Sequence, residues 1–122
     1  MAAENKNIEI LSSKARTATE SSVVQKSRDF DGIHVIIDVT AVTATPSVVP
    51  TIEGYDPISG KYYTLLTGVA ITATGTTVLK VFPNATAVAN VSVNDFVPLN
   101  FRVTMTHGDA DSITYSVSAN LN

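Results

Sequence analysis

The sequence predicts an all-β fold, an antiparallel β-sandwich of the jelly-roll or immunoglobulin-like type with about seven to eight short strands. Three observations predict it. Apolar and polar residues alternate in several runs, turn residues recur roughly every 8–12 positions, and no long segment has the period of a helix. The abundance of Val, Thr, Ser and Ala also suits pleated, half-buried strands.

The last part of the chain carries the clearest strand pattern. From Val97 to Met105 every second residue is apolar, and the same alternation returns from Ile113 to Leu121. Successive side chains of a strand point to opposite faces, so a period of two indicates one buried and one solvated face. The polar segment His107–Asp111 lies between the two runs. We therefore expect a β-hairpin with one face in the core.

The first thirty residues differ from the rest, because they hold most of the lysines and only scattered apolar residues. We interpret residues 1–30 as an N-terminal arm with room for one edge strand around Arg16–Val24, followed by a β-sandwich domain over residues 31–122. Two interpretations of the arm remain open. It becomes ordered only against a neighbouring subunit, or it is an ordinary edge strand of the same domain.

The middle of the chain reads as short strands separated by turns. A strand is expected over 33–40, and the next run, 47–53, contains Pro50, which cannot donate a ladder hydrogen bond. That strand is therefore expected at a sheet edge or with a bulge at Pro50. The segment Gly54–Lys61, with Asp-Pro and Ser-Gly, predicts a turn. The remaining expected strands are 61–66, 68–73 and 76–82.

Length and composition exclude several classes of protein. A chain of 122 residues makes one domain, and the lack of cysteine excludes disulfides and thiolate metal sites. A net charge of −3 with 16% charged residues argues against nucleic acid as a partner. No apolar run approaches the ~20 residues that span a bilayer, and the N-terminus lacks a signal-peptide pattern. We expect no membrane association and synthesis in the cytoplasm.

The sequence offers little that resembles catalytic chemistry. Neither His34 nor His107 accompanies a nucleophile-elbow motif, and Gly54–Lys61 has the wrong spacing and context for a phosphate-binding loop. The cluster His107–Asp111 supplies oxygen and nitrogen ligands, but aspartate and glycine are also what a tight turn requires. Asp29 and Asp31 share a face and are best interpreted as solvated charge. We expect no enzyme, no cofactor and no metal.

Three tyrosines lie close to the predicted turn. Tyr55, Tyr62 and Tyr63 are candidates for a protein- or sugar-contact patch at a loop tip. The alternative is that they are cross-strand partners within a sheet. With Pro50, whose strand is expected at an edge, they form the set of candidate partner-contact residues.

Four segments resemble a family of small structural proteins of tailed bacteriophages, with capsid decoration or auxiliary proteins among them. The resemblance is carried by Gly32–Val49, Gly54–Tyr63 and Ala73–Leu79, together with Arg102–Val117, and covers about residues 16–122. Members are virion components without a catalytic motif.

The resemblance implies a virion structural protein, of the capsid decoration type that binds and stabilises the head shell. The alternatives are a tail or head–tail connector component, or a carbohydrate-binding adhesion module that uses the tyrosine loop. The expected partners are the major capsid protein or other virion subunits, in a homo-oligomer that would be a trimer at local three-fold axes. Sheet edges and the arm are the expected contact elements.

Overall fold

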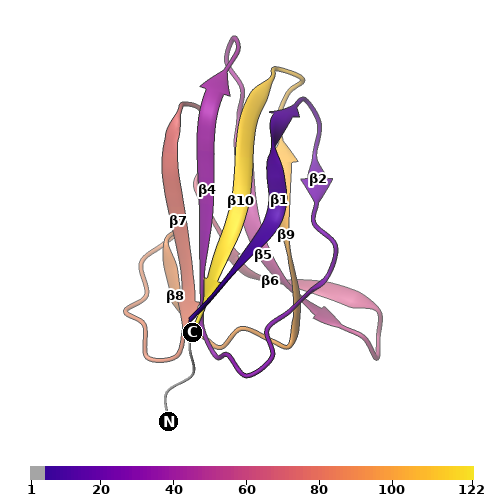
Figure 1. Ribbon diagram of the computed structural model, residues 1–122, viewed down its shortest axis with the longest axis vertical. Helices are drawn as coiled ribbons and strands as arrows, with labels where there is room; N and C mark the ends of the chain where they lie inside the picture. Colours follow the sequence, from indigo (N-terminus) through magenta and orange to yellow (C-terminus); the bar gives the residue numbers. More distant parts are fainter. Residues whose placement is uncertain (1–4) are drawn as a thin grey trace.

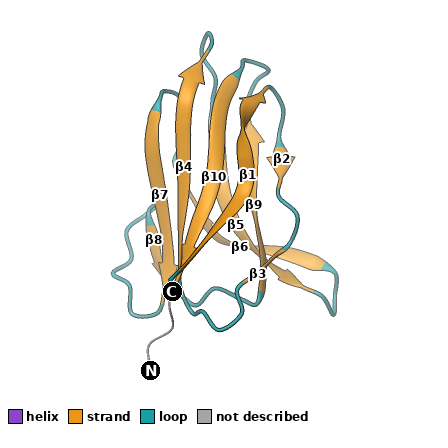
Figure 2. Cartoon of the chain, viewed as in Figure 1, coloured by secondary structure: helices purple, strands orange, loops and turns teal. Residues whose placement is uncertain are grey.

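A computed structural model describes residues 5–122, and this part of the chain is all-β (Figure 1). Residues 5–122 form ten strands and no helix (Figure 2). The all-β prediction is confirmed. The structure has more strands than the seven to eight expected, because it includes three very short ones. These are β2, β3 and β8, which have only two or three residues each. The strands are β1 (Lys6–Arg16), β2 (Glu20–Ser21), β3 (Gln25–Lys26), β4 (Ile33–Val42), β5 (Val48–Asp56), β6 (Lys61–Thr67), β7 (Gly75–Phe82), β8 (Ser92–Asn94), β9 (Asn100–His107) and β10 (Ile113–Leu121).

The strands form two open sheets, which we call sheet A and sheet B. Sheet A has the order β1-β10-β4-β7-β8, and sheet B has the order β2-β9-β5-β6, with β3 also paired to β9. All pairs are antiparallel except β7 with β8. Five of the pairings are nested, as in a long hairpin folded over on itself: β1 with β10, β2 and β3 with β9, β4 with β7, and β5 with β6.

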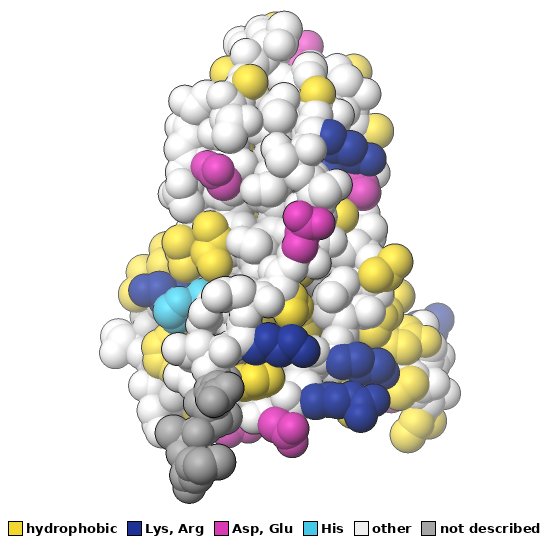
Figure 3. Space-filling view, in the orientation of Figure 1, with side chains coloured by type: hydrophobic (Ala, Val, Ile, Leu, Met, Phe, Trp, Pro, Cys, Tyr) yellow, Lys and Arg dark blue, Asp and Glu magenta, His cyan; other side chains and the backbone are white. Residues whose placement is uncertain are grey.

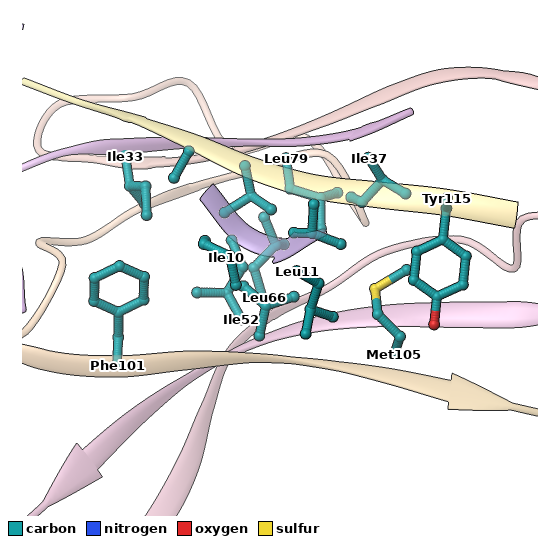
Figure 4. Close-up of a cluster of buried hydrophobic side chains, with 14 of the residues drawn as sticks. Ile10, Leu11, Ile33, Ile37, Ile52, Leu66, Leu79, Phe101, Met105 and Tyr115 are labelled. Atoms are coloured by element: carbon teal, nitrogen blue, oxygen red, sulfur yellow. The ribbon is translucent and has the colours of Figure 1, made fainter. Parts of the chain in front are cut away.

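The hydrophobic core draws on both sheets (Figure 4). Ile33, Ile37, Leu79 and Tyr115 come from sheet A, whereas Ile52, Phe101 and Met105 come from sheet B. Each of these side chains is almost completely buried. In β4, β9 and β10 buried residues alternate with less buried ones, so one face of each of these strands lies in the core, as the alternation in the sequence predicted.

The last two strands follow the predicted pattern of faces but do not form the predicted hairpin. Every second residue from Ile113 to Leu121 is buried, as are Phe101, Val103 and Met105. However, β9 belongs to sheet B and β10 to sheet A, so the segment between them carries the chain from one sheet to the other. Alternation specifies which face is buried, and two facing sheets bury the same pattern as two paired strands. Leu99 precedes β9 and is 53% exposed, contrary to the pattern.

The strand that contains Pro50 is an interior strand, which corrects the expected edge position. β5 lies between β9 and β6, and its register shift falls between Ile52 and Glu53, not at Pro50. The β5–β6 ladder runs only from Thr51↔Thr67 onward, so Pro50 lies just beyond it. Its carbonyl accepts a hydrogen bond from the N–H of Gly68 (2.8 Å). The proline is tolerated because it stands where the pairing with β6 ends.

The β-strand expected over 68–73 does not form. Only Ile71 bridges to β5, with backbone hydrogen bonds of 3.0 and 2.7 Å to Val48. The alternating pattern in this segment is short, and most of the segment forms the connection from β6 in sheet B to β7 in sheet A.

The segment over residues 6–26 carries three strands. β1 lies at the edge of sheet A, paired to β10 along its length, with Ile10 and Leu11 buried. The chain then crosses to sheet B, where β2 and β3 both pair with β9. The single strand expected around Arg16–Val24 is thus replaced by the end of β1 and the short β2.

Candidate partner-contact site

The β5–β6 hairpin has the turn that the sequence predicted, and its geometry is fixed by Asp56. The Asp56 carboxylate accepts hydrogen bonds from Ser59 Oγ (2.8 Å) and the Ile58 backbone N–H (3.1 Å). The Gly60 N–H donates to the Asp56 carbonyl (2.8 Å), and Gly60 adopts φ +73°, which favours glycine. The hydrogen bond from the Ser59 hydroxyl, followed by that from the Ile58 N–H, lowers the pKa of Asp56. This turn presents Ile58 with 96% of its surface exposed.

Tyr55 and Tyr62 form a cross-strand pair directly before and after this turn. Their ring centroids are 4.7 Å apart, and they are register partners in the ladder. The Arg102 guanidinium from β9 lies 3.4 Å from the centroid of the Tyr62 ring. Arg102 also donates to Glu53 Oε1 (2.9 Å), which in turn accepts from the Thr104 hydroxyl. The two tyrosines therefore belong to a continuous ladder across β6, β5 and β9.

Tyr63 points to the opposite face of β6 from Tyr62. Its ring lies over Gly54, because a Cβ built on Gly54 would come within 2.3 Å of Tyr63 Cζ. Gly54 is buried and is also the register partner of Phe101. The Tyr63 ring can lie this close only because residue 54 is a glycine and has no side chain. The structure brings Tyr55 and Tyr62 together and separates them from Tyr63.

Pro50 lies away from the three tyrosines, at the start of β5. Its side chain is buried, and a Cβ on Gly68 would lie 2.8 Å from its ring. Its position is inside the fold, so it does not join the tyrosines in one exposed surface.

Sequence reasoning missed Ile58, Arg102 and Glu53. Ile58 stands out only because an apolar residue occupies the centre of an Asp-Pro-x-Ser-Gly turn, where polar residues are usual. Arg102 and Glu53 occupy the polar positions of their strands, but only the β5–β9 register makes them neighbours.

A second polar cluster lies where β1 ends and the chain crosses between the sheets. The Arg16 side chain is buried, and its guanidinium donates to the carbonyls of Ser12 (2.7 Å), Tyr115 (2.7 Å) and Lys14 (3.2 Å) and to Glu20 Oε1 (2.8 Å). Arg16 Cζ lies 4.5 Å from the centroid of the Tyr115 ring. A hydrogen bond of 3.0 Å joins Tyr115 Oη to His107 Nε2, and burial raises the pKa of Tyr115 to about 12.

The aspartates of His107–Asp111 serve the connection between β9 and β10. Asp111 Oδ2 accepts from the Thr45 backbone N–H (3.1 Å), and Asp109 Oδ1 accepts from the Asp111 N–H (3.0 Å). Across residues 5–122, no group of three or more His, Cys, Asp or Glu side chains is arranged to hold a metal ion.

Both histidines make the stability of the fold dependent on pH. Burial lowers the pKa of His107 below its ordinary value of 6.5, and burial followed by the charge of Lys80 lowers the pKa of His34. The unfolded chain therefore takes up protons at a higher pH than the folded chain does. The stability that the two neutral histidines contribute is fully present above about pH 6.5 and is lost as the pH falls below that value. We expect the urea midpoint to fall between about pH 7.5 and pH 5.

The variant His107→Gln separates this effect from the titration of carboxylates. It keeps a side chain that can hydrogen-bond to Tyr115 but removes the titration, so its urea midpoint is expected to fall less than that of the unmodified chain. An equal fall in both proteins, or a midpoint that rises on acidification, contradicts the assignment.

The comparisons with known proteins identify no relative. No family model, curated protein or solved structure matches this chain. Within residues 5–122, no helix has the length and apolar character needed to cross a membrane.

Proposed function

We propose that the two sheets form a jelly-roll sandwich. The proposal rests on the order of the strands. With β2 and β3 taken as one broken strand and the short β8 set aside, eight strands pair as first with last, second with seventh, third with sixth and fourth with fifth. This nested order is that of a long hairpin wound into two facing sheets, and jelly rolls have eight strands in two Greek keys.

We propose further that the chain is a structural protein of a tailed-phage virion, of the capsid decoration type. The strand order is the observation that carries the proposal, because jelly rolls recur in viral capsid domains. The resemblance of residues 16–122 to small phage structural proteins points the same way. The aspartates at the two main turns hold backbone and hydroxyl groups in place, which is a structural use of these side chains.

A carbohydrate-binding module is the alternative from another class, since jelly rolls also occur in lectins. Sugar recognition by aromatic stacking needs an open ring face. Arg102 covers one face of the Tyr62 ring at 3.4 Å, and Tyr55 lies against it at 4.7 Å. The ladder geometry of these tyrosines therefore favours a structural role over sugar binding.

The proposal is tested on particles of the phage that encodes the chain. Quantitative mass spectrometry of purified particles is expected to give a copy number comparable to that of the shell subunit, arranged as trimers if three-fold sites are occupied. The purified chain is also expected to co-sediment with heads that lack it. A few copies per particle would indicate a tail or connector component. Absence from particles, or glycan binding that is lost in Tyr62→Ala, would overturn the proposal.

A further inference from the structure

The sheet edges of this chain are poorly suited to adding a strand from another subunit. β1 has register shifts at Glu9/Leu11 and Leu11/Lys14, and the Arg16 guanidinium occupies the carbonyls of Ser12 and Lys14. β6 has a register shift that leaves Leu65 unpaired opposite Ile52 and Glu53, and it begins with a lysine. β2, β3 and β8 are two or three residues long. Bulges, lysines and short strands are the devices that prevent edge pairing. Contacts between copies through the described strands are therefore expected to use side chains more than sheet edges.

The tip of the β5–β6 hairpin is the most prominent apolar projection that the structure describes. Beyond Gly54 the hairpin leaves β9, so its end is supported only by its own two strands and projects from the flank of the molecule (Figure 1). Ile58 is 96% exposed, and Pro57 beside it is exposed as well. The Asp56 hydrogen bonds and the Tyr62–Arg102 contact hold the hairpin in one shape. Such a rigid projection loses little conformational entropy when it binds.

A hollow of about 440 Å³ lies on a different part of the surface, where β4 begins and β7 and β10 end. Its apolar part is formed by Phe82 and Pro83, and its polar rim includes Asp31, His34 and Asn120. A Cβ on Gly32 would lie 2.8 Å from Phe82 Cβ, so the missing side chain at position 32 lets Phe82 lie close against the start of β4. The Asp31 and Gly32 N–H groups both donate to the Asn122 carbonyl (3.2 and 2.9 Å), so the backbone around the hollow is also fixed. Hydrophobic side chains are seen on both lower flanks of the sheet A face (Figure 3).

The tip carries one charge of each sign, Asp56 and Lys61. The Asp56 carboxylate is turned to the Ser59 hydroxyl and the Ile58 N–H of its own turn, which leaves Lys61 as the charge that can pair with an acidic group on the hollow. Lys61 follows the turn directly and is exposed, and Asp31 is exposed on the rim of the hollow. Of the residues that the structure describes, none forms an ion pair with Lys61 or with Asp31, since the pairs found there are Arg16–Glu20 and Arg102–Glu53. A lone lysine beside one isoleucine gives too little charge and apolar area for stable attachment to a membrane.

We propose that the hairpin tip of one copy of this chain seats in the hollow of a second copy. Ile58 and Pro57 pack against Phe82 and Pro83, and Lys61 approaches Asp31. Tip and hollow are different surfaces, so each copy donates one and accepts the other, and the contact is head-to-tail. Such a contact closes into a ring or continues as a filament. It is small, so the single contact is weak, with a dissociation constant on the order of 0.1 mM.

The proposal is tested with the purified full chain alone, by sedimentation equilibrium up to about 1 mM. Ile58→Asp is expected to weaken self-association by about tenfold or more, as is normal for a central apolar anchor. The matched control is Val69→Asp, which puts the same charge at another exposed β-branched residue (63% exposed) outside the tip and is expected to change nothing. A thermal unfolding midpoint equal to that of the unmodified chain shows that each variant is folded.

Charge exchange tests which surfaces meet. Lys61→Asp and Asp31→Lys are each expected to weaken the association severalfold, and the double variant is expected to restore it. A mixture of Ile58→Asp, which keeps its hollow, with Asp31→Lys, which keeps its tip, is expected to stop at a heterodimer. A chain that stays monomeric throughout, association that Ile58→Asp leaves unchanged, or single charge variants without effect would overturn the proposal. These results concern the isolated chain, so they are independent of whether the chain is found in virions.

Discussion

Phe101→Ala is expected to lower the free energy of unfolding by about 3–5 kcal/mol. Phe101 has no exposed surface, and it lies in β9 between register partners in β3 and β5, Gln25 and Gly54. Gly54 has no side chain that can move into the space left by the ring, and the Tyr63 ring already lies over it. The cavity therefore cannot collapse cheaply, which places the cost in the upper part of the range for large-to-small substitutions. Urea unfolding followed by circular dichroism measures it.

Leu99→Ala is the matched control for this prediction. Leu99 continues the same alternation in the sequence, but it lies outside β9 and is 53% exposed. Its truncation is expected to cost about 0.5 kcal/mol or less. If Phe101→Ala costs under about 1 kcal/mol, or if the two variants cost the same, the burial of this face of β9 is assigned wrongly.

The contrast between Phe101 and Leu99 shows how far alternation reaches. A period of two identifies the buried face within β9 and β10, and it does so correctly from Phe101 to Met105 and from Ile113 to Leu121. It does not say where a strand begins, so Leu99 was included. It also does not say which strand is the partner, and β9 and β10 belong to different sheets. Pairing depends on which strands meet in space, and that is a property of the whole chain.

Pro50 illustrates a local rule that the tertiary structure overrides. A proline lacks the N–H that a central strand needs, so the sequence predicts an edge position or a bulge at Pro50. In the structure β5 has neighbours on both sides, yet the β6 ladder reaches only to Thr51. Pro50 therefore lies just beyond the β5–β6 ladder, where no N–H is needed for pairing. The point at which this ladder ends depends on the length of β6, which cannot be inferred from the residues around Pro50.

The candidate site was predictable in its residue types and unpredictable in its arrangement. The turn at Asp56–Gly60 follows from its sequence, and the tyrosines around it were identified. That Tyr62 pairs with Tyr55 and Arg102 while Tyr63 covers Gly54 depends on the β5–β6 and β5–β9 registers. Each register is set by long-range packing, so the sequence could indicate a tyrosine patch but could not show that it divides between two faces.

Arg16→Met is expected to lower the free energy of unfolding by about 3 kcal/mol, although it replaces a charge with an apolar side chain of similar length. The Arg16 side chain is only 4% exposed, and its guanidinium is a donor to three backbone carbonyls and to Glu20. Methionine fills the volume but leaves those carbonyls without these donors. The loss also frees the crossing from β1 to β2, because Arg16 ties the end of β1 to Glu20 and to β10.

Two further variants separate the hydrogen-bond network from charge alone. Arg16→Lys keeps the charge but cannot reach four acceptors with one ammonium group, so we expect it to recover less than half of the loss. Arg102→Met removes the other paired arginine, whose side chain is 23% exposed, and is expected to cost only about 1 kcal/mol. If Arg16→Lys is as stable as the unmodified chain, or if the two Met variants cost the same, then the charge of Arg16 and not its carbonyl contacts holds β1 to the fold. That result would be unexpected, because an arginine this deeply buried is stabilised mainly by the groups that accept its hydrogen bonds.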